Sequence, residues 1–172
     1  MKKVLLLLAV LGLPFFLAAC GSEEQGDFTP GVYFGYSSGH QNSFAVVTVD
    51  DNGMIVSVLI DSVYLKSEAG GPVNWVSRGN DVSGIATTKR SLDGGCGYNM
   101  WPAQPVVNCE VEGEIMWVEQ VNMIAAAVVE NQGVPSWTLE ENYFGEDGIA
   151  GVSIRVNAYI EAVNAALAQA RN

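Results

Sequence analysis

The turn Asp50-Asp51-Asn52-Gly53 constrains the fold more than any other feature of this chain. Asn-Gly turns favour short β-hairpin loops, because Asn and Gly tolerate the positive φ that such loops require. The flanking segments, residues 44–50 and 54–61, are rich in Val and Ile and are apolar on both faces. The pattern therefore predicts an antiparallel hairpin in a sheet that is covered on each side.

The rest of the chain predicts one more strand and two helices. Residues 31–36 have strand composition, and residues 62–108 are rich in Gly and Pro and predict a mainly irregular region with one short helix. Residues 112–132 and 154–170 show helical spacing of apolar side chains. This order of elements predicts an α+β fold, with a small antiparallel sheet packed against two main helices in a single domain. The predicted buried stripes are Trp117, Val121, Ile124 and Val128 in the first helix, and Val156, Ile160, Val163, Leu167 and Ala170 in the second.

The N-terminus has the pattern of a secretory signal. Two lysines precede an apolar run that is shorter than the roughly 20 residues of a membrane-spanning helix. The following Leu-Ala-Ala-Cys resembles the bacterial lipobox, with Cys20 as the lipidated residue. We therefore expect a signal peptide over residues 1–19, a lipidated Cys20 and flexible tether over residues 20–27, and a domain over residues 28–172. The anchor would place the domain on the extracytoplasmic side of the cell membrane or outer membrane.

The net charge excludes one class of partner. Without the signal the chain keeps 8 − 2 = 6 basic residues against 19 acidic ones, which gives a net charge of 6 − 19 = −13. Nucleic-acid binding needs clustered Lys and Arg that neutralise phosphates. The sequence therefore predicts a membrane partner through the lipid anchor and no nucleic acid.

Two further cysteines predict a disulfide. Cys96 and Cys109 flank a Gly- and Pro-rich loop in an oxidising compartment. Their spacing is not C-x-x-C, which favours a structural staple over a redox pair. A bridge of this loop length contributes roughly 3 kcal/mol.

No catalytic or metal constellation is predicted. Gly35-Tyr36-Ser37-Ser38-Gly39 fits the G-x-S-x-G pattern, but strands are predicted on both sides of it. The only histidine, His40, follows immediately and lies too close in sequence to act as the base for Ser37. One histidine and a disulfide also leave no cluster of soft metal ligands.

The segment from Asp147 to Ser153 is the main candidate site. It leads into the last predicted helix, and Gly151 permits a sharp turn or close approach to a ligand. Ser153 then has two interpretations. It is an ordinary N-cap residue, or it contacts a phosphate at the helix N-terminus with help from Arg155. On spacing alone the N-cap is the commoner arrangement.

The ordered motifs resemble the FMN-binding domain family of secreted and membrane-anchored proteins. Members begin with a G-x-Y strand and a D-G or N-G hairpin, and they end with D-x-x-S-G-A-T running into a helix. This chain has Gly31-Val32-Tyr33, the Asn52-Gly53 turn, and the sequence DGIAGVS over residues 147–153, followed by AVNAAL over residues 162–167. The segments TKRSL over residues 88–92, GYNM over residues 97–100 and WVEQ over residues 117–120 resemble a lipoprotein branch.

The resemblance implies a flavin site. In the family, a flavin transferase esterifies the last motif residue to the FMN phosphate, and that position is Ser153. Asp147 and Gly151 match the motif, whereas Ala150, Val152 and Ser153 depart from it. The departures leave open whether the FMN is covalent or non-covalent. Candidate ring platforms are Tyr98, Met100, Trp101 and Trp137, and candidate phosphate partners are Lys89, Arg90 and Arg155.

The expected function is a lipid-anchored flavoprotein that relays electrons at the membrane surface to membrane redox partners. It is an electron-transfer protein rather than a substrate-turning enzyme. The alternative is a non-catalytic surface lipoprotein that keeps the fold without flavin, as a binding or structural module.

Overall fold

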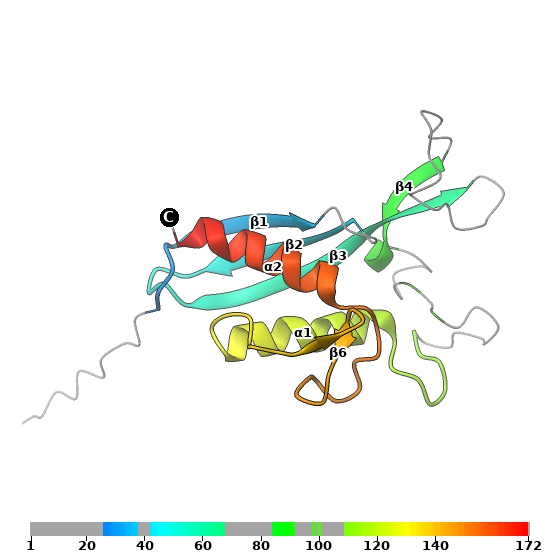
Figure 1. Ribbon diagram of the computed structural model, residues 1–172. Helices are drawn as coiled ribbons and strands as arrows, with labels where there is room; N and C mark the ends of the chain where they lie inside the picture. Colours follow the sequence, from blue (N-terminus) through cyan, green and yellow to red (C-terminus); the bar gives the residue numbers. More distant parts are fainter. Residues whose placement is uncertain are drawn as a thin grey trace, which may run out of the picture.

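A computed structural model describes residues 26–37, 42–67, 84–91, 98, 100 and 109–171. Its order of strands and helices confirms the predicted α+β class (Figure 1). The elements, in chain order, are β1 (Gly31–Ser37), β2 (Ser43–Val49), β3 (Ile55–Ser67), β4 (Gly84–Thr88), the 3-10 turn η2 (Lys89–Ser91), α1 (Trp117–Glu130), β5 (Leu139–Glu140), β6 (Tyr143–Phe144) and α2 (Asn157–Ala170).

The main sheet has the order β1-β2-β3-β4, with every neighbouring pair antiparallel. The predicted hairpin joins β2 to β3. One carboxylate oxygen of Asp50 accepts hydrogen bonds from the backbone N–H groups of Asn52 (3.0 Å) and Met54 (2.8 Å), and Gly53 has a φ of 78°. A short polar side chain and a glycine thus close the turn, as the sequence indicates.

The region after the hairpin contains more strand than predicted. β3 continues to Ser67 and pairs with β4, so the prediction of an irregular segment from residue 62 is wrong for residues 62–67 and 84–88. Asp61 obscured this continuation, because a carboxylate usually marks a strand end. Its side chain is instead buried and accepts the backbone N–H of Ser62 at 2.7 Å.

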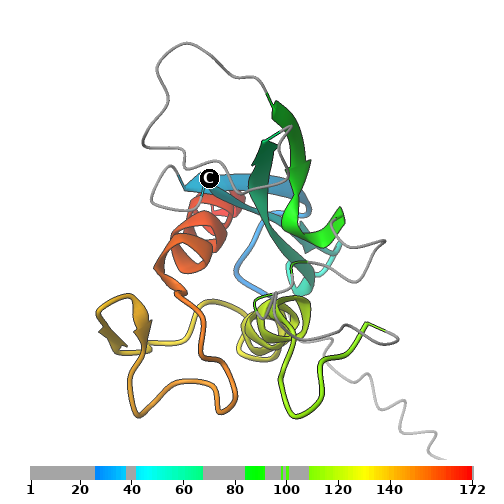
Figure 2. The same cartoon turned by 90° about the vertical axis from the view of Figure 1, so that its right-hand side faces the viewer.

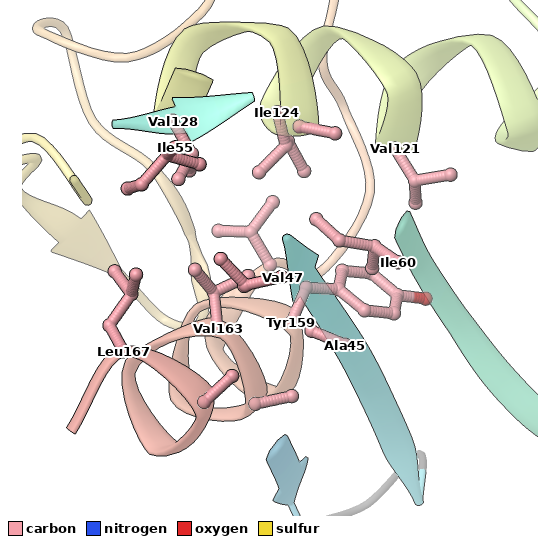
Figure 3. Packing of buried hydrophobic residues seen from close by; sticks show 14 of the residues in the cluster. Ala45, Val47, Ile55, Ile60, Val121, Ile124, Val128, Tyr159, Val163 and Leu167 are labelled. Atoms are coloured by element: carbon pink, nitrogen blue, oxygen red, sulfur yellow. The ribbon is translucent and has the colours of Figure 1, made fainter. Parts of the chain in front are cut away.

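Both helices cover the same face of the sheet. α2 packs on β1 and β2, and α1 packs on β3, which Figures 1 and 2 show from two directions. Side chains from both helices and the inner sheet face meet in one core (Figure 3). The residues labelled there include Val47 and Ile60 of the sheet, Ile124 of α1 and Leu167 of α2, all nearly inaccessible to solvent.

On the other face of the sheet, several large apolar side chains are exposed to solvent. Val32 is 68% exposed, Phe34 55% and Leu59 43%. The prediction of a sheet covered on both faces is therefore wrong for these strands. The two-sided apolar pattern does not distinguish a covered face from an exposed one, since both are built from the same residue types.

β1 and α2 lie in direct backbone contact, although β1 is the first element in the sequence and α2 the last. A Cβ added to Gly35 would lie 1.9 Å from the carbonyl oxygen of Ala162, so only glycine permits this approach. The Ser37 hydroxyl donates to the Glu161 carboxylate at 2.6 Å. The helix backbone therefore packs directly against the backbone of the first strand at Gly35.

Helix α1 is shorter than its predicted range of residues 112–132. Gly113 has a φ of 77°, a left-handed conformation that a right-handed helix cannot include. The Glu119 carboxylate then accepts the backbone N–H of Met116 at 2.7 Å and caps the helix start. Gly133 follows the C-terminal end, as predicted.

Candidate functional site

The segment that contains Ser153 is not the helix cap that the sequence suggested. α2 begins at Asn157, and its N-cap position is Val156, which makes no side-chain capping bond. Ser153 precedes that position by three residues. The predicted helix over residues 154–170 therefore starts too early, and both the N-cap role of Ser153 and its place at the first helical amides are wrong.

Ser153 is instead held by helix α1. Its backbone N–H donates to the side-chain oxygen of Gln120 at 2.7 Å, and its hydroxyl lies 3.5 Å from the same oxygen. The other end of the Gln120 amide donates to the carbonyl of Ile115 at 2.8 Å. Gln120 is almost completely buried, whereas Ser153 is exposed. A buried amide thus fixes the backbone of Ser153, a residue whose side chain is exposed.

The remaining motif residues position this segment rather than contact a ligand. The Asp147 carboxylate accepts the backbone N–H of Thr138 at 2.9 Å and its hydroxyl at 3.0 Å, which closes the loop at its base. Gly151 has a φ of 87°, which supplies the sharp turn that was predicted. Ala150 is exposed, and Val152 packs against the core.

Ser153 and Arg155 line a pocket of about 340 Å³. Its walls come from η2, α1, β6, the segment before α2, and α2 itself, together with two residues of the chain between η2 and α1. The lining is rich in aromatic rings and holds two basic groups. The residues are Lys89, Tyr98, Met100, Trp117, Tyr143, Ser153, Ile154, Arg155 and Tyr159.

Lys89 lies half-buried among aromatic rings on one side of this pocket. Its ammonium nitrogen is 4.6 Å from the ring centre of Tyr98 and 5.1 Å from that of Trp117. It donates to the Tyr159 hydroxyl at 3.5 Å. Burial lowers the pKa of Lys89 to about 8, and the negative charge of Asp61 opposes this shift only in part.

Tyr159, on α2, lines the pocket next to Trp117 of α1. Its hydroxyl accepts the indole N–H of Trp117 at 2.9 Å, and the two rings meet edge to face at 6.1 Å. Burial raises the pKa of Tyr159 to about 12. The phenol therefore stays protonated at neutral pH and remains a hydrogen-bond donor as well as an acceptor.

Arg155 lies on the exposed side of the pocket. Its Nε donates to the Tyr143 hydroxyl at 3.3 Å, and its guanidinium carbon is 5.9 Å from the centre of that ring. The pocket thus places a positive charge and an open hydroxyl, Ser153, near its mouth, with aromatic walls behind them. This combination suits a ligand with an anionic end and a flat ring.

Other sequence candidates do not line the pocket. Arg90 donates to the carbonyl of Ile60 and to the Asn122 side chain, both at 2.7 Å, and so fastens η2 to β3 and α1. Trp137 packs against Phe144, with ring centres 4.8 Å apart. Both are structural here.

The predicted lipidation and disulfide residues fall largely outside the described part of the chain. Cys20, Cys96 and Trp101 belong to residues that the structure does not describe. Cys109 is described and is disulfide-bonded. Its pairing with Cys96 stays a prediction.

Sequence reasoning missed four lining residues: Trp117, Tyr143, Ile154 and Tyr159. Trp117 was assigned to the helix stripe that faces the core. Its side chain is indeed buried there, but it also lines the pocket. Tyr159 stands three residues after Val156, on the stripe predicted for α2, and that spacing was the available signal. Tyr143 had no local signal.

Among the described residues, no group of three or more His, Cys, Asp or Glu side chains is arranged to hold a metal ion. In the same residues no helix has the length and apolar character needed to cross a bilayer.

Comparison with known proteins adds no relative. The chain matches no protein-family model, no curated protein and no solved structure.

Proposed function

We propose that this protein binds FMN in the pocket at Ser153 and relays electrons as a lipid-anchored flavoprotein outside the cytoplasm. The observation that carries the proposal is the convergence of Ser153 and Arg155 with Lys89 and several aromatic rings around one pocket. The family resemblance named Ser153 from a motif, and the pocket supplies an independent geometric reason to select the same residue.

The lining fits the two chemical parts of FMN. An anionic phosphate suits the mouth, where the Arg155 guanidinium and the Ser153 hydroxyl both face the pocket. An isoalloxazine ring needs flat apolar walls, which Tyr98, Trp117 and Tyr159 supply. The volume of about 340 Å³ lies at the lower end of the usual range for ligand pockets, so part of the cofactor would remain outside it.

The roles of the chain's own residues follow from this arrangement. Bound flavin would supply one- and two-electron transfer. Gln120 holds the Ser153 backbone in place, and the Trp117 indole donates to the Tyr159 hydroxyl, so these two parts of the lining are fixed before binding. Lys89 places a positive charge against the rings, which favours a ligand that gains negative charge on reduction.

The exposed hydroxyl of Ser153 also suits covalent attachment by a flavin transferase. The serine oxygen would form a bond to the phosphorus of the flavin donor while its proton and the donor's leaving group depart. The substitution of Ser for Thr in the motif keeps this chemistry. The anchor at Cys20 would hold the flavin near membrane redox partners.

Titration of the flavin-free protein with FMN, followed by flavin fluorescence, tests the binding. We expect saturable quenching, and Arg155→Gln should weaken it by about fivefold to tenfold through loss of an exposed charge contact worth roughly 1 kcal/mol. Arg171→Gln is the matched control, since Arg171 lies over Phe28 and not in the pocket. A protein that shows no saturable quenching would refute flavin binding and leave the non-catalytic surface module.

Covalent attachment has a separate test. Co-expression with a flavin transferase should give in-gel flavin fluorescence that survives denaturation. Ser153→Ala should abolish it, whereas Ser136→Ala, another exposed loop serine, should not. Persistence of the label in Ser153→Ala would overturn Ser153 as the attachment site.

A further inference from the structure

Lys89 is positioned by its neighbours in the chain rather than by an ion pair. The next residue, Arg90, is tied to β3 through the carbonyl of Ile60 and through Asp61, whose carboxylate accepts the Arg90 backbone N–H at 3.3 Å. The Ser91 hydroxyl donates to the carbonyl of Thr88 at 3.0 Å and closes the turn. This short turn therefore aims one amine into the pocket. Among the described residues no carboxylate forms an ion pair with that amine.

The surroundings of the Lys89 amine leave about a tenth of it uncharged at pH 7, far more than for an ordinary lysine. The groups that face it are the rings of Tyr98 and Trp117, the Tyr159 hydroxyl on α2 and the more distant carboxylate of Asp61 on β3. The rings and the carboxylate favour the ammonium, but burial outweighs them and lowers the pKa to about 8. A lysine with a lowered pKa in an apolar pocket is an activated nucleophile.

We propose that Lys89 captures small anionic aldehydes and 2-oxo acids in this pocket as a reversible imine. The lone pair of Nζ attacks the carbonyl carbon, and the carbonyl electron pair moves to its oxygen. Both protons of the amine then pass from nitrogen to that oxygen, which departs as water while the C=N bond forms. Amine and carbonyl compound thus give imine and water, so the step needs no oxidant, reductant or cofactor.

Two other lining residues suit this chemistry. The Tyr159 hydroxyl lies 3.5 Å from Nζ, stays protonated and also hydrogen-bonds the Ser62 side chain, so by exchanging that bond it can donate to the departing oxygen. Arg155 lines the same pocket and presents a guanidinium to a carboxylate or phosphate on the carbonyl compound. The inference does not require flavin, and it holds or fails independently of the proposed function.

The composition of the chain makes the test selective. Beyond Cys20 the sequence contains only two lysines, Lys66 and Lys89. The flavin-free protein is incubated with glyoxylate and cyanoborohydride, which reduces the imine and leaves a carboxymethyl group on the nitrogen. Peptide mass spectrometry then reads each lysine and the N-terminal amine separately. Lys66 serves as the internal control within the same folded molecule.

We expect Lys89 to be labelled at least about tenfold faster than Lys66 at pH 7. A pKa of about 8 instead of 10.5 gives roughly 300-fold more neutral amine at that pH, and the lower basicity and restricted access of Lys89 offset part of it. The rate at Lys89 should rise with pH and level off above pH 8. Equal rates at the two lysines, or no label on Lys89, would overturn the proposal.

The preference for an anionic compound has its own comparison. Arg155→Gln should slow labelling of Lys89 by glyoxylate but not by propanal, a neutral aldehyde, because only the former gains from the guanidinium. An equal effect on the two aldehydes, or none on either, would refute the selection of anions.

Discussion

Replacing Gln120 by Met removes the buried amide that ties the Ser153 segment to helix α1. The substitution keeps an unbranched side chain of similar size, so the packing of this nearly inaccessible position is retained. It leaves the Ser153 backbone N–H and the Ile115 carbonyl without the partners that Gln120 provides at 2.7 and 2.8 Å. Each loss costs about 1–1.5 kcal/mol, which predicts a decrease of roughly 2–3 kcal/mol in the free energy of unfolding.

Urea denaturation followed by tryptophan fluorescence measures this change. With a usual urea dependence, the expected loss lowers the midpoint by about 1 M or more. Gln169→Met is the matched control. Gln169 also donates two hydrogen bonds, to the carbonyls of Phe34 (2.7 Å) and Ala165 (3.1 Å), but it is exposed, so water replaces them and the cost stays near 0.5 kcal/mol. Equal losses in the two variants would refute the argument that burial decides the cost.

Three further substitutions test other parts of the structure. Gly35→Ala places a Cβ 1.9 Å from a helix carbonyl and should lower the free energy of unfolding by about 3 kcal/mol. Its control is Gly145→Ala, whose Cβ would lie 3.3 Å from the nearest atom and should cost less than about 1 kcal/mol. Similar losses of unfolding free energy in the two variants would contradict the close contact at Gly35. Tyr159→Phe leaves the buried indole N–H of Trp117 without its acceptor and should cost about 1–3 kcal/mol, so an unchanged unfolding midpoint would contradict it. Lys89→Met tests the sign of a pH effect. Folding lowers the pKa of Lys89 to about 8, so the unfolded chain binds more protons between pH 8 and 10.5. Over that interval the free energy of unfolding of the wild type should rise by roughly 1–2 kcal/mol relative to the variant. This is less than the free energy equivalent to the whole pKa shift, because the side chain is partly exposed. A difference that does not vary with pH would exclude the shift.

The fold was predictable wherever a local pattern carried it. The turn at Asn52-Gly53 and the spacing of Trp117, Val121, Ile124 and Val128 depend on residues close in sequence, and both predictions are confirmed. The β5–β6 hairpin was not predicted. Its turn uses Glu141 and Asn142 with positive φ, and Glu gives no such indication. The late start of α2 was also missed, because Val156 occupies the cap position without a side-chain acceptor.

The candidate site was predictable only where the chemistry of single residues stood out. Ser153, Arg155, Lys89, Tyr98 and Met100 were all named from the sequence, and the structure brings them to one pocket. Asp147 was named as part of the motif, and in the structure its carboxylate accepts hydrogen bonds from Thr138. No spacing rule places residues 89, 143 and 159 together, since tertiary packing alone sets these distances.

The backbone contact between β1 and α2 has a consequence for how the chain reaches its folded form. The hydrogen bond between Ser37 and Glu161 joins residues 124 positions apart. The backbone N–H of Thr29 likewise donates to the carbonyl of Ala170 at 2.8 Å. The inner face of the first strand therefore finds its cover only when the last helix has arrived. Contacts of such long separation slow folding. The domain thus reaches its folded form only after nearly all of its residues have been synthesised.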